Sequence, residues 1–425
     1  MNILIIGVGY VGLATGISLA IKGYNVRFYD KNKEKITLLK NGKLPFFEPK
    51  LQKTLIESLN DKRVIFFDNF KEAIANAEVV FICVGTPIFK NGDTNSKDIE
   101  KVAMEIKKNK QGKTVIVIRS TVNPKVYNSI KSILSDKDFH LAVNPEFLRE
   151  GKALDDTLNP SRIVVGTDDK VAKETLKKLY SSFDAPKIFT DPISAILIKY
   201  ASNSFLAVKI SFINEIANLS DKLGGNIDDI AKGLGLDPRI GKDFLKAGIG
   251  FGGSCLPKDA KNIVKYAKET GINLDIIDAA SKLNDKQYKV VIRKLKQYLG
   301  SLNGKKIAVF GLSFKGGTDD LRNSVSFRII SDLLRAGAIL KLHDYLAWIK
   351  AKELVKVTLV SNDPYLVAED TDAIVIATDW NEYLNEDWKK IKSLMKGNLI
   401  IDGRNILDGG LLKKIGFIYE GIGRK

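Results

Sequence analysis

The sequence predicts an α/β protein with two doubly wound parallel-sheet domains, joined by a long central helix and a small helical domain. Apolar segments typical of strands alternate with helix-like segments up to about residue 190, and the alternation returns from about residue 300. Such alternation indicates a parallel sheet with helices on both faces. Between the two regions the chain runs from Ile193 to Leu223 without a glycine or proline, which predicts one long helix.

The first region, residues 1–190, opens with a strand and a glycine-rich turn. The strand NILIIG leads into GVGYVG, residues 7–12, and a helix-like segment follows. In such a turn Gly7 allows the sharp bend, Gly9 lets a pyrophosphate approach the backbone, and Gly12 lets the helix pack against the strand. The positive end of the helix would hold the pyrophosphate. The turn therefore predicts a Rossmann-like dinucleotide-binding domain, and a turn without a ligand is the alternative.

Asp30 ends the second predicted strand, NVRFYD, eighteen residues after Gly12. A carboxylate here accepts a hydrogen bond from a ribose 2′-hydroxyl and repels a 2′-phosphate, so it favours NAD over NADP. The strands RVIFF, AEVVFICVG, TVIVIRS and HLAVNPE follow. Ligands of open parallel sheets bind outside the carboxyl ends of the strands, where Thr86, Ser120 and Thr121 lie. These hydroxyls would contact the nicotinamide half of the cofactor, or they cap helices.

Two polar pairs stand four residues apart. Glu146 and Glu150 in NPEFLREG would share a face if that segment is helical, and close carboxylates suit a general base. A solvated acidic pair is the alternative. Lys199 and Asn203 share a face of the long predicted helix, in an otherwise apolar stretch. This lysine could stabilise an oxyanion, or it could extend its amine to solvent.

The segment GIGFGGSCLPKD, residues 248–259, places Cys255 after four glycines. Glycines adopt backbone angles closed to other residues, so successive amides could face one concave site. Lys258 would favour the thiolate of Cys255, and Asp259 could hold that lysine or a water. The alternative is a cysteine that only fills space, which is our interpretation of Cys83 in the apolar strand VVFICVG.

We assign the long helix and this cysteine segment to a central helical domain, residues 191–295. The third domain, residues 296–425, contains the predicted strands KKIAVFGLSF, ILKLHD, TDAIVIATDW and GNLIIDGRN. This domain repeats the architecture of the first but lacks the GxGxxG turn, so we expect it to bind something other than a dinucleotide. The basic residues and glycines of FKGGTDDLRNS, residues 314–324, suit a phosphate, and Arg404 ends another strand.

Composition limits the function classes. The chain has 425 residues, a formal net charge of +17 and two cysteines, which are too few for a disulfide framework and suit a reducing compartment. The first residues lack the features of a secretory signal, and no apolar run reaches the roughly 18 residues of a membrane span. The lysines are spread along the chain. We therefore expect a cytoplasmic protein that binds anionic small molecules, and neither nucleic acid nor a membrane.

Taken in order, GVGYVG, ICVGTP, RSTV, NPEFLREG, GFGGSCLPKD and FKGGTDDLRNS resemble the motifs of the UDP-glucose/GDP-mannose dehydrogenase family. The similarity extends from residue 7 to residue 405. DPRIG followed by FLKAGIGFGGSCLPKD is most similar to the branch that oxidises UDP-glucose, and the branches for GDP-mannose or other nucleotide sugars are the alternative. The resemblance implies a four-electron oxidation of UDP-glucose to UDP-glucuronate, with NAD as the cofactor and no metal.

The resemblance also implies residue roles. Cys255 would trap the aldehyde as a thiohemiacetal and then carry a thioester that water hydrolyses. Lys199 would stabilise the oxyanion with help from Asn203. Asp259, with Thr121, would position a water or act as a base. The implied catalytic residues are Cys255, Lys199, Asn203, Asp259, Thr121, Glu146 and Glu150.

In the same resemblance, Glu146 would serve thioester hydrolysis and Glu150 would lie where the nicotinamide meets the substrate. The implied cofactor contacts are Gly7, Gly9, Val11, Gly12, Asp30, Lys35, Thr86, Thr121, Glu150, Lys258 and Arg322. The implied substrate contacts are Glu146, Phe147, Leu148, Lys199, Asn203, Arg239, Phe251, Gly252, Phe314, Lys315 and Arg404. The long helix would also form the core of a homodimer.

Overall fold

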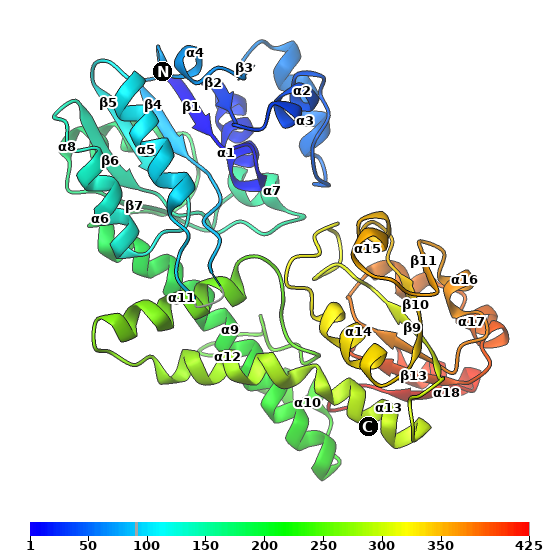
Figure 1. Ribbon diagram of the computed structural model, residues 1–425. Helices are drawn as coiled ribbons and strands as arrows, with labels where there is room; N and C mark the ends of the chain where they lie inside the picture. Colours follow the sequence, from blue (N-terminus) through cyan, green and yellow to red (C-terminus); the bar gives the residue numbers. More distant parts are fainter. Residues whose placement is uncertain (90–91, 425) are drawn as a thin grey trace. The chain divides into compact units, whose positions relative to one another are not determined.

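The structure is a computed structural model, and it describes residues 1–89 and 92–424. It contains two sheets of mainly parallel strands, with a helical segment between them in the sequence (Figure 1). The predicted fold class is therefore confirmed. The chain divides into two compact units, Met1–Ser202 and Asn203–Lys425, and each is described by itself below. The three domains bounded at residues 190 and 295 stay a prediction.

The sheet of the first unit has the strand order β3-β2-β1-β4-β5-β6-β7-β8. Its strands are β1 (Asn2–Ile6), β2 (Asn25–Tyr29), β3 (Val64–Phe67), β4 (Val79–Ile82), β5 (Thr114–Ile118), β6 (Phe139–Val143), β7 (Ile163–Gly166) and β8 (Lys187–Thr190). β6 and β7 meet antiparallel at Val143 and Gly166, and the other neighbours are parallel. The sequence analysis did not predict β7 and β8, so it missed this one antiparallel junction.

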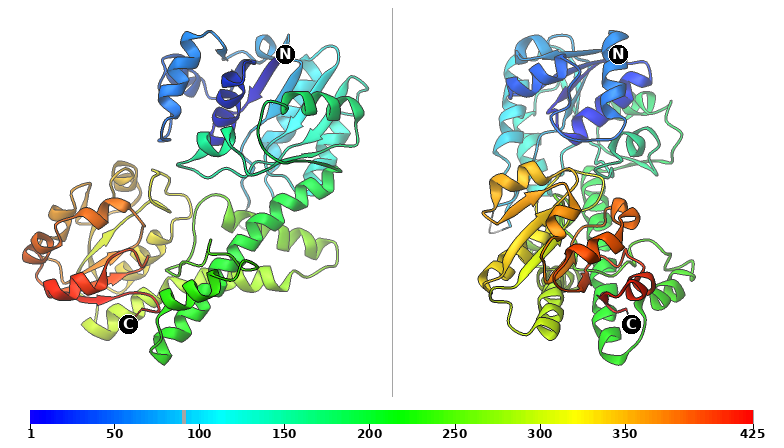
Figure 2. Two further views of the ribbon diagram at one scale, coloured as in Figure 1. Left: turned by 180° about the vertical axis from the view of Figure 1, so that it is seen from behind. Right: turned by 90° about the vertical axis from the view of Figure 1, so that its right-hand side faces the viewer.

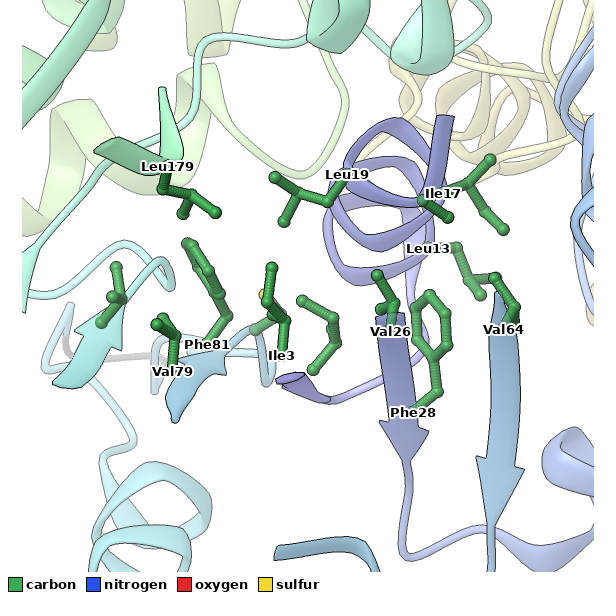
Figure 3. Packing of buried hydrophobic residues seen from close by; sticks show 14 of the residues in the cluster. Ile3, Leu13, Ile17, Leu19, Val26, Phe28, Val64, Val79, Phe81 and Leu179 are labelled. Carbon is green, nitrogen blue, oxygen red and sulfur yellow. The ribbon is translucent and has the colours of Figure 1, made fainter. Parts of the chain in front are cut away.

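Helices cover both faces of this sheet. They are α1 (Tyr10–Ile21), α2 (Lys33–Lys40), α3 (Leu51–Asn60), α4 (Phe70–Ile74), α5 (Lys97–Asn109), α6 (Pro124–Ile133), α7 (Ala153–Leu158) and α8 (Lys170–Leu179). Ile3 of β1 packs with Leu13 and Ile17 of α1 in one buried cluster (Figure 3). The next residue of the strand, Leu4, points to the opposite face and is fully buried as well. This double burial explains why these strands are apolar throughout.

The long helix α9 (Pro192–Leu223) has 32 residues and is continuous (Figure 2). It confirms the helix predicted from residue 193 to residue 223. By length and composition α9 could also cross a membrane, so the expectation that no segment is long and apolar enough is wrong. Its most apolar window has a mean hydropathy of 1.3, and 44% of that window is buried inside the protein. A core helix of a globular protein has the same properties.

The second unit continues with α10 (Ile227–Gly235), α11 (Leu256–Glu269), α12 (Asp275–Gln287) and α13 (Lys289–Leu299). Its sheet has the order β11-β10-β9-β12-β13-β14, and all neighbours are parallel. The strands are β9 (Lys306–Phe310), β10 (Ile339–His343), β11 (Leu359–Ser361), β12 (Ala373–Ile376), β13 (Leu399–Asp402) and β14 (Ile418–Glu420). The flanking helices are α14 (Val325–Arg335), α15 (Trp348–Leu354), α16 (Pro364–Ala368), the 3₁₀ helix η1 (Asn381–Asn385), α17 (Trp388–Leu394) and α18 (Gly409–Ile415).

The two sheets repeat one architecture. From β3 to β6, the first sheet has the strand order of dinucleotide-binding folds, and the second sheet has this order throughout. The turns after the first strands also match. Gly7 has a φ of 99° and donates its amide to the Tyr29 carbonyl at 2.8 Å, while Gly311 has a φ of 97° and donates to the His343 carbonyl at 2.7 Å. The repeat predicted from the strand pattern is therefore confirmed.

Candidate active site

The glycine turn between β1 and α1 is shaped by close packing at two positions and by open space at the third. A Cβ on Gly7 would lie 2.7 Å from the carbonyl oxygen of Cys83, and a Cβ on Gly12 would lie 1.8 Å from the carbonyl oxygen of Gly7. Among the described residues, no atom beyond the chain neighbours of Gly9 lies within 4 Å of the corresponding point there. The turn therefore leaves room at Gly9, in front of the N-terminus of α1, and this geometry fits a pyrophosphate.

Asp30 follows β2, and Asp344 follows the corresponding strand of the other sheet, β10. The two carboxylates differ in how many hydrogen bonds they accept within the protein. Asp30 is partly exposed and accepts hydrogen bonds from the amides of Val8 and Asn32, both at 2.9 Å. Asp344 is fully buried and accepts hydrogen bonds from residues 312–313, after β9, and from residues 346–347, after β10. It also accepts one from the indole of Trp380. Asp30 can therefore reach a ribose hydroxyl. Asp344 has a structural role, which agrees with a second sheet that binds no dinucleotide.

The hydroxyl groups in the loops after β4 and β5 donate hydrogen bonds to backbone carbonyls of the protein. Thr86 donates to the carbonyl of Thr121 at 2.6 Å, and Ser120 donates to the carbonyl of Val84 at 2.6 Å. These bonds join the two loops at the carboxyl ends of neighbouring strands. Neither hydroxyl caps a helix.

Two other predicted cofactor contacts, Val11 on α1 and Lys35 on α2, are both partly buried.

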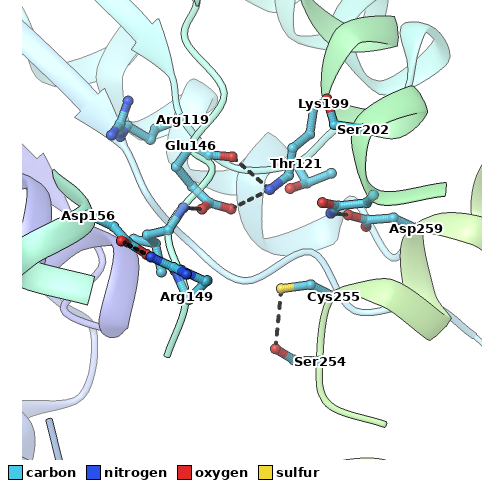
Figure 4. Close-up of polar contacts among 12 residues, drawn as sticks. Arg119, Thr121, Glu146, Arg149, Asp156, Lys199, Ser202, Ser254, Cys255 and Asp259 are labelled. Carbon is cyan, nitrogen blue, oxygen red and sulfur yellow. Dashed lines mark hydrogen bonds and ion pairs between the residues drawn. The ribbon is translucent and has the colours of Figure 1, made fainter. Parts of the chain in front are cut away.

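Glu146 and Lys199 form a buried ion pair in the first unit (Figure 4). The ammonium lies 2.8 Å from Oε1 of Glu146 and donates to the Glu146 carbonyl at 2.6 Å. The other carboxylate oxygen accepts the amide of Leu148 at 2.8 Å. The exposed fractions of Glu146 and Lys199 are only 6% and 3%. Lys199 therefore does not extend to solvent, and Glu146 is not a surface acid.

The segment that carries Glu146 and Glu150 is a loop and not a helix, so the two carboxylates do not share a helix face. The loop is held at its end by Glu48, which is 4% exposed. Its carboxylate accepts the amides of Gly151 at 2.8 Å and Ala153 at 2.7 Å. The sequence analysis missed Glu48, and the acidic residue within FFEPK was the only signal that could have suggested it.

Cys255 lies at the N-terminus of α11 in the second unit, and its side chain is exposed. The hydroxyl of Ser254 is 3.5 Å from its sulfur (Figure 4). Pro257 occupies the first turn of α11, where it fits because that position needs no amide donor. The positive end of a helix stabilises an anion, which favours the thiolate of a cysteine in this position.

Asp259, one turn into α11, is fully buried and has two polar partners. Asn203 of α9 donates its amide to Oδ2 at 2.6 Å, and the ammonium of Lys258 lies 2.5 Å from Oδ1. The structure thus brings together the predicted residues Asn203 and Asp259. Lys258 pairs with Asp259, which was one of the two roles expected for this aspartate. The negative charge of Asp259 offsets the positive charge of Lys258, which was expected to favour the Cys255 thiolate.

The glycine loop before Cys255 is held by side-chain amides of α9 and α12. Asn214 accepts the amide of Gly248 at 2.7 Å, and Gln287 donates to the carbonyl of Gly248 at 3.0 Å. Asn284 accepts the amide of Phe251 at 2.8 Å and donates to its carbonyl at 3.0 Å. Asn284 and Gln287 were not identified from the sequence.

The same loop packs against the ends of the second sheet. Arg404 donates to the carbonyl of Gly250 at 2.7 Å, and the amide of Gly253 donates to the carbonyl of Arg322 at 3.1 Å. A Cβ on Gly253 would lie 2.8 Å from the ring of Phe314. Burial lowers the pKa of Arg404. One of its terminal nitrogens is buried without a hydrogen bond to any described residue, which fits a contact with a bound ligand.

The remaining predicted contacts of this unit lie near the loop or on the surface. A Cβ on Gly252 would meet the carbonyl oxygen of Asn323 at 2.4 Å, so only glycine fits there. The ammonium of Lys315 lies 5.7 Å from the centre of the Phe314 ring. Arg322 and Arg239 pair with the nearby carboxylates of Asp320 and Asp237.

The chain matches three successive family domains. It matches the NAD binding domain of the UDP-glucose/GDP-mannose dehydrogenase family over residues 1–184, the central domain over 193–286 and the UDP binding domain over 308–409.

The chain belongs to the UDP-glucose/GDP-mannose dehydrogenase family. It is an NAD-dependent oxidoreductase, and the predicted cofactor is confirmed.

Several members of this family resemble the chain over its full length. A UDP-glucose 6-dehydrogenase of Rickettsia felis is 42% identical and is matched over 100% of this chain and 97% of its own length. The structure of a UDP-glucose dehydrogenase from Pyrobaculum islandicum has a TM-score of 0.93 at 34% identity, with 100% and 98% coverage. A UDP-D-ManNAc dehydrogenase from Pyrococcus horikoshii has a TM-score of 0.89 at 29% identity, with 100% and 99% coverage.

Proposed function

We propose that this chain catalyses the NAD-dependent, four-electron oxidation of UDP-glucose to UDP-glucuronate. The observation that carries the proposal is an exposed thiol, Cys255, at the positive end of α11 and at the end of a glycine loop fixed from both sides. A cysteine is needed because oxidation of an alcohol to an acid passes through an aldehyde, which a covalent bond to sulfur retains. The UDP-glucose dehydrogenases among the relatives support UDP-glucose as the substrate.

The first two-electron step removes hydrogen from the C6 alcohol. NAD supplies the hydride acceptor in both oxidations. Asp259 is proposed to hold, together with Thr121, the water that takes the alcohol proton. The partners of Asp259, Asn203 and Lys258, support this role because they fix the buried carboxylate in place. Lys199 is proposed to stabilise the negative charge that develops on the C6 oxygen.

In the second half, the Cys255 thiolate adds to the aldehyde carbon and forms a thiohemiacetal. Loss of a second hydride converts it to a thioester, and water then attacks the thioester carbon and releases the carboxylic acid and the thiol. Glu146 is proposed to accept a proton from that water. Its burial against Lys199 supports the assignment, because a carboxylate oxygen held 2.8 Å from an ammonium has a fixed orientation.

The UDP portion is assigned to the second sheet. Arg404 and Phe314 contact the glycine loop, and Lys315 lies next to Phe314. One terminal nitrogen of Arg404 is buried and has no hydrogen bond to a described residue. For the assembly, we propose a homodimer through α9, because six large apolar side chains of this helix are exposed on one broad face: Ile193, Leu197, Phe205, Phe212, Leu219 and Leu223. We place the protein in the cytoplasm, where UDP-glucose and reduced cysteines coexist.

The test is the number of NADH molecules formed for each nucleotide sugar consumed, measured with UDP-glucose, GDP-mannose and UDP-N-acetylmannosamine. The proposal predicts two NADH per UDP-glucose, together with UDP-glucuronate as the product. One NADH would indicate a simple two-electron dehydrogenase, and none with any sugar would indicate a nucleotide-sugar sensor. Two NADH with GDP-mannose alone would move the assignment to that branch.

A further inference from the structure

A cavity of about 370 Å³ lies within the first unit, beside the loop that carries Glu146. It is lined by α1, by the ends of β5 and β6, by α7 and β7, and by the residues that follow α8. Figure 4 shows Arg119 and Lys199 on opposite sides of Glu146, and Arg119 is the one that lines this cavity. Gly9 and Asp30 do not line it, so the cavity differs from the proposed cofactor site.

Arg119 brings an uncompensated positive charge to this cavity. Its side chain is 9% exposed, and among the described residues no carboxylate pairs with it. Its Nε donates to the hydroxyl of Thr15 at 3.0 Å, and one terminal nitrogen donates to Asn144. The other terminal nitrogen makes no hydrogen bond to a described residue, although arginine has donors to satisfy there. A buried cation without a counter-ion is costly unless an anion binds beside it.

Arg162 adds a second positive charge. Its guanidinium stacks on the ring of Phe147, 3.7 Å from the ring centre, and donates to the hydroxyls of Ser161 and Ser202. Within residues 1–89 and 92–424 it has no carboxylate partner, and burial lowers the pKa of Arg162. The third arginine of the cavity, Arg149, differs because it forms a two-pronged pair with Asp156.

The charges that line the cavity therefore do not cancel. Glu146 is neutralised by Lys199, and Asp156 is neutralised by Arg149, which leaves the charges of Arg119 and Arg162. We propose that this cavity binds a small phosphate dianion, either free phosphate or the phosphate group of a monoester. Guanidinium groups bind phosphate oxygens through paired N–H donors. A phosphate dianion also balances both positive charges, whereas a ligand with a single carboxylate balances only one of them. Thr15 and Tyr180 line the same space.

Such a ligand would affect the loop that carries Glu146 through the two arginines, without contacting Cys255. Arg162 supports Phe147, and Arg119 holds Asn144, so both arginines contact the segment that precedes or follows Glu146. A phosphate bound to them would change the position of this segment, and we expect a change in kcat for UDP-glucose oxidation. This kinetic effect rests on the proposed function, whereas the binding itself does not.

The test is isothermal titration of the full-length protein with inorganic phosphate, and separately with phenyl phosphate, at constant ionic strength. Each titration is run with and without saturating NAD⁺ and UDP, because phosphate could otherwise enter their sites. One phosphate per chain is expected, and acetate should bind about tenfold more weakly or not at all. If only one of the two compounds binds to saturation, that result would show whether the ligand is free phosphate or a phosphate monoester.

Two variants test the residues. Arg162→Gln and Arg119→Lys should each weaken phosphate binding by about tenfold, because each removes paired donors from the cavity. Arg119→Lys retains the buried charge, which protects the fold. Arg63→Gln, the same loss of charge at an exposed arginine of this unit, should bind phosphate normally. The proposal is overturned by no binding up to about 10 mM phosphate, by binding that NAD⁺ and UDP abolish, or by unchanged binding in both variants. An enzyme inactive on UDP-glucose that still binds phosphate would contradict the proposed function alone.

Discussion

The two cysteines show how position determines what a residue can do. Cys83 follows β4, is 8% exposed, and burial raises the pKa of its thiol to about 12. Such a thiol stays protonated and acts as a small apolar side chain. Cys255 is exposed at the positive end of α11. The interpretation of Cys83 as a filler is thus supported by its burial, and the nucleophilic role of Cys255 is a proposal.

Cys255→Ser is expected to abolish UDP-glucuronate formation, because a serine hydroxyl is a much weaker nucleophile than a thiolate and forms no thioester. Turnover to the acid should fall by at least about a thousandfold. The measurement is UDP-glucuronate formed over time, by chromatography. Cys83→Ala, which removes the other thiol, should keep most of the activity. Full oxidation by Cys255→Ser would remove Cys255 from the mechanism.

Asp30 is the residue that we expect to select the cofactor. Asp30→Asn should raise the KM for NAD⁺ by about tenfold, since a charge-assisted hydrogen bond is replaced by a neutral one. It should also reduce the preference for NAD⁺ over NADP⁺, because the repulsion of a 2′-phosphate is lost. The readout is kcat/KM with each cofactor. Asp68→Asn, after the neighbouring strand β3, should change neither value, and an unchanged preference in Asp30→Asn would exclude the role.

At the scale of elements, the glycine loop shows that flexible residues can be held in one conformation. Gly250 has a φ of 98°, which favours glycine, and Asn284 binds both backbone groups of the next residue, Phe251. The loop is thus fixed by α12 on one side and by Arg404 on the other. A fixed loop keeps Cys255 in position at little entropic cost during the reaction.

Asn284→Ala is expected to lower kcat/KM for UDP-glucose by about ten- to a hundredfold, because two buried backbone groups lose their partner and the loop moves. The free energy of unfolding should fall by about 2 kcal/mol, so most of the protein stays folded. Steady-state kinetics and thermal denaturation provide the two values. Lys286→Ala, an exposed change on the same helix, serves as the control. Unaltered kinetics in Asn284→Ala would show that the loop needs no such support.

At the scale of the whole molecule, the exposed apolar side chains of α9 support the proposed homodimer. Phe205 and Phe212 are 64% and 47% exposed, and Leu223 is 76% exposed. A contiguous apolar face of this kind marks a protein interface or a membrane contact. The buried ion pair of Lys199 at one end of the helix and the amide of Asn214 farther along favour a protein interface, because both are expensive to place in lipid.

Phe212→Asp is expected to convert a dimer into a monomer, because dimer formation would then bury an unpaired charge. The mass in solution, from light scattering or sedimentation equilibrium, measures the change. Leu354→Asp, at the end of α15, places the same charge at a leucine that is 65% exposed and should leave the dimer intact. A monomeric wild-type protein would contradict the proposed assembly, and so would a Phe212→Asp dimer.

The sequence alone determined the fold class, the long helix α9 and most strands, because periodicity and apolar runs are local properties. It also determined the family, because the motifs occur in a specific order. The strands β7, β8, β11 and β14 were missed. β11 and β14 have only three residues, which is too short for a clear pattern, and β14 is held in place by its pairing with β13.

The tertiary structure decided which partner each polar residue takes. Asn284 holds Phe251 from 33 positions away in the chain, and Glu48 holds Ala153 from 105 positions away. The segment at Glu146 is a loop and not a helix, and the Glu146 carboxylate pairs with Lys199. Hydrogen bonds and ion pairs depend on distances of about 3 Å between side chains, and only the packing of distant segments sets these distances.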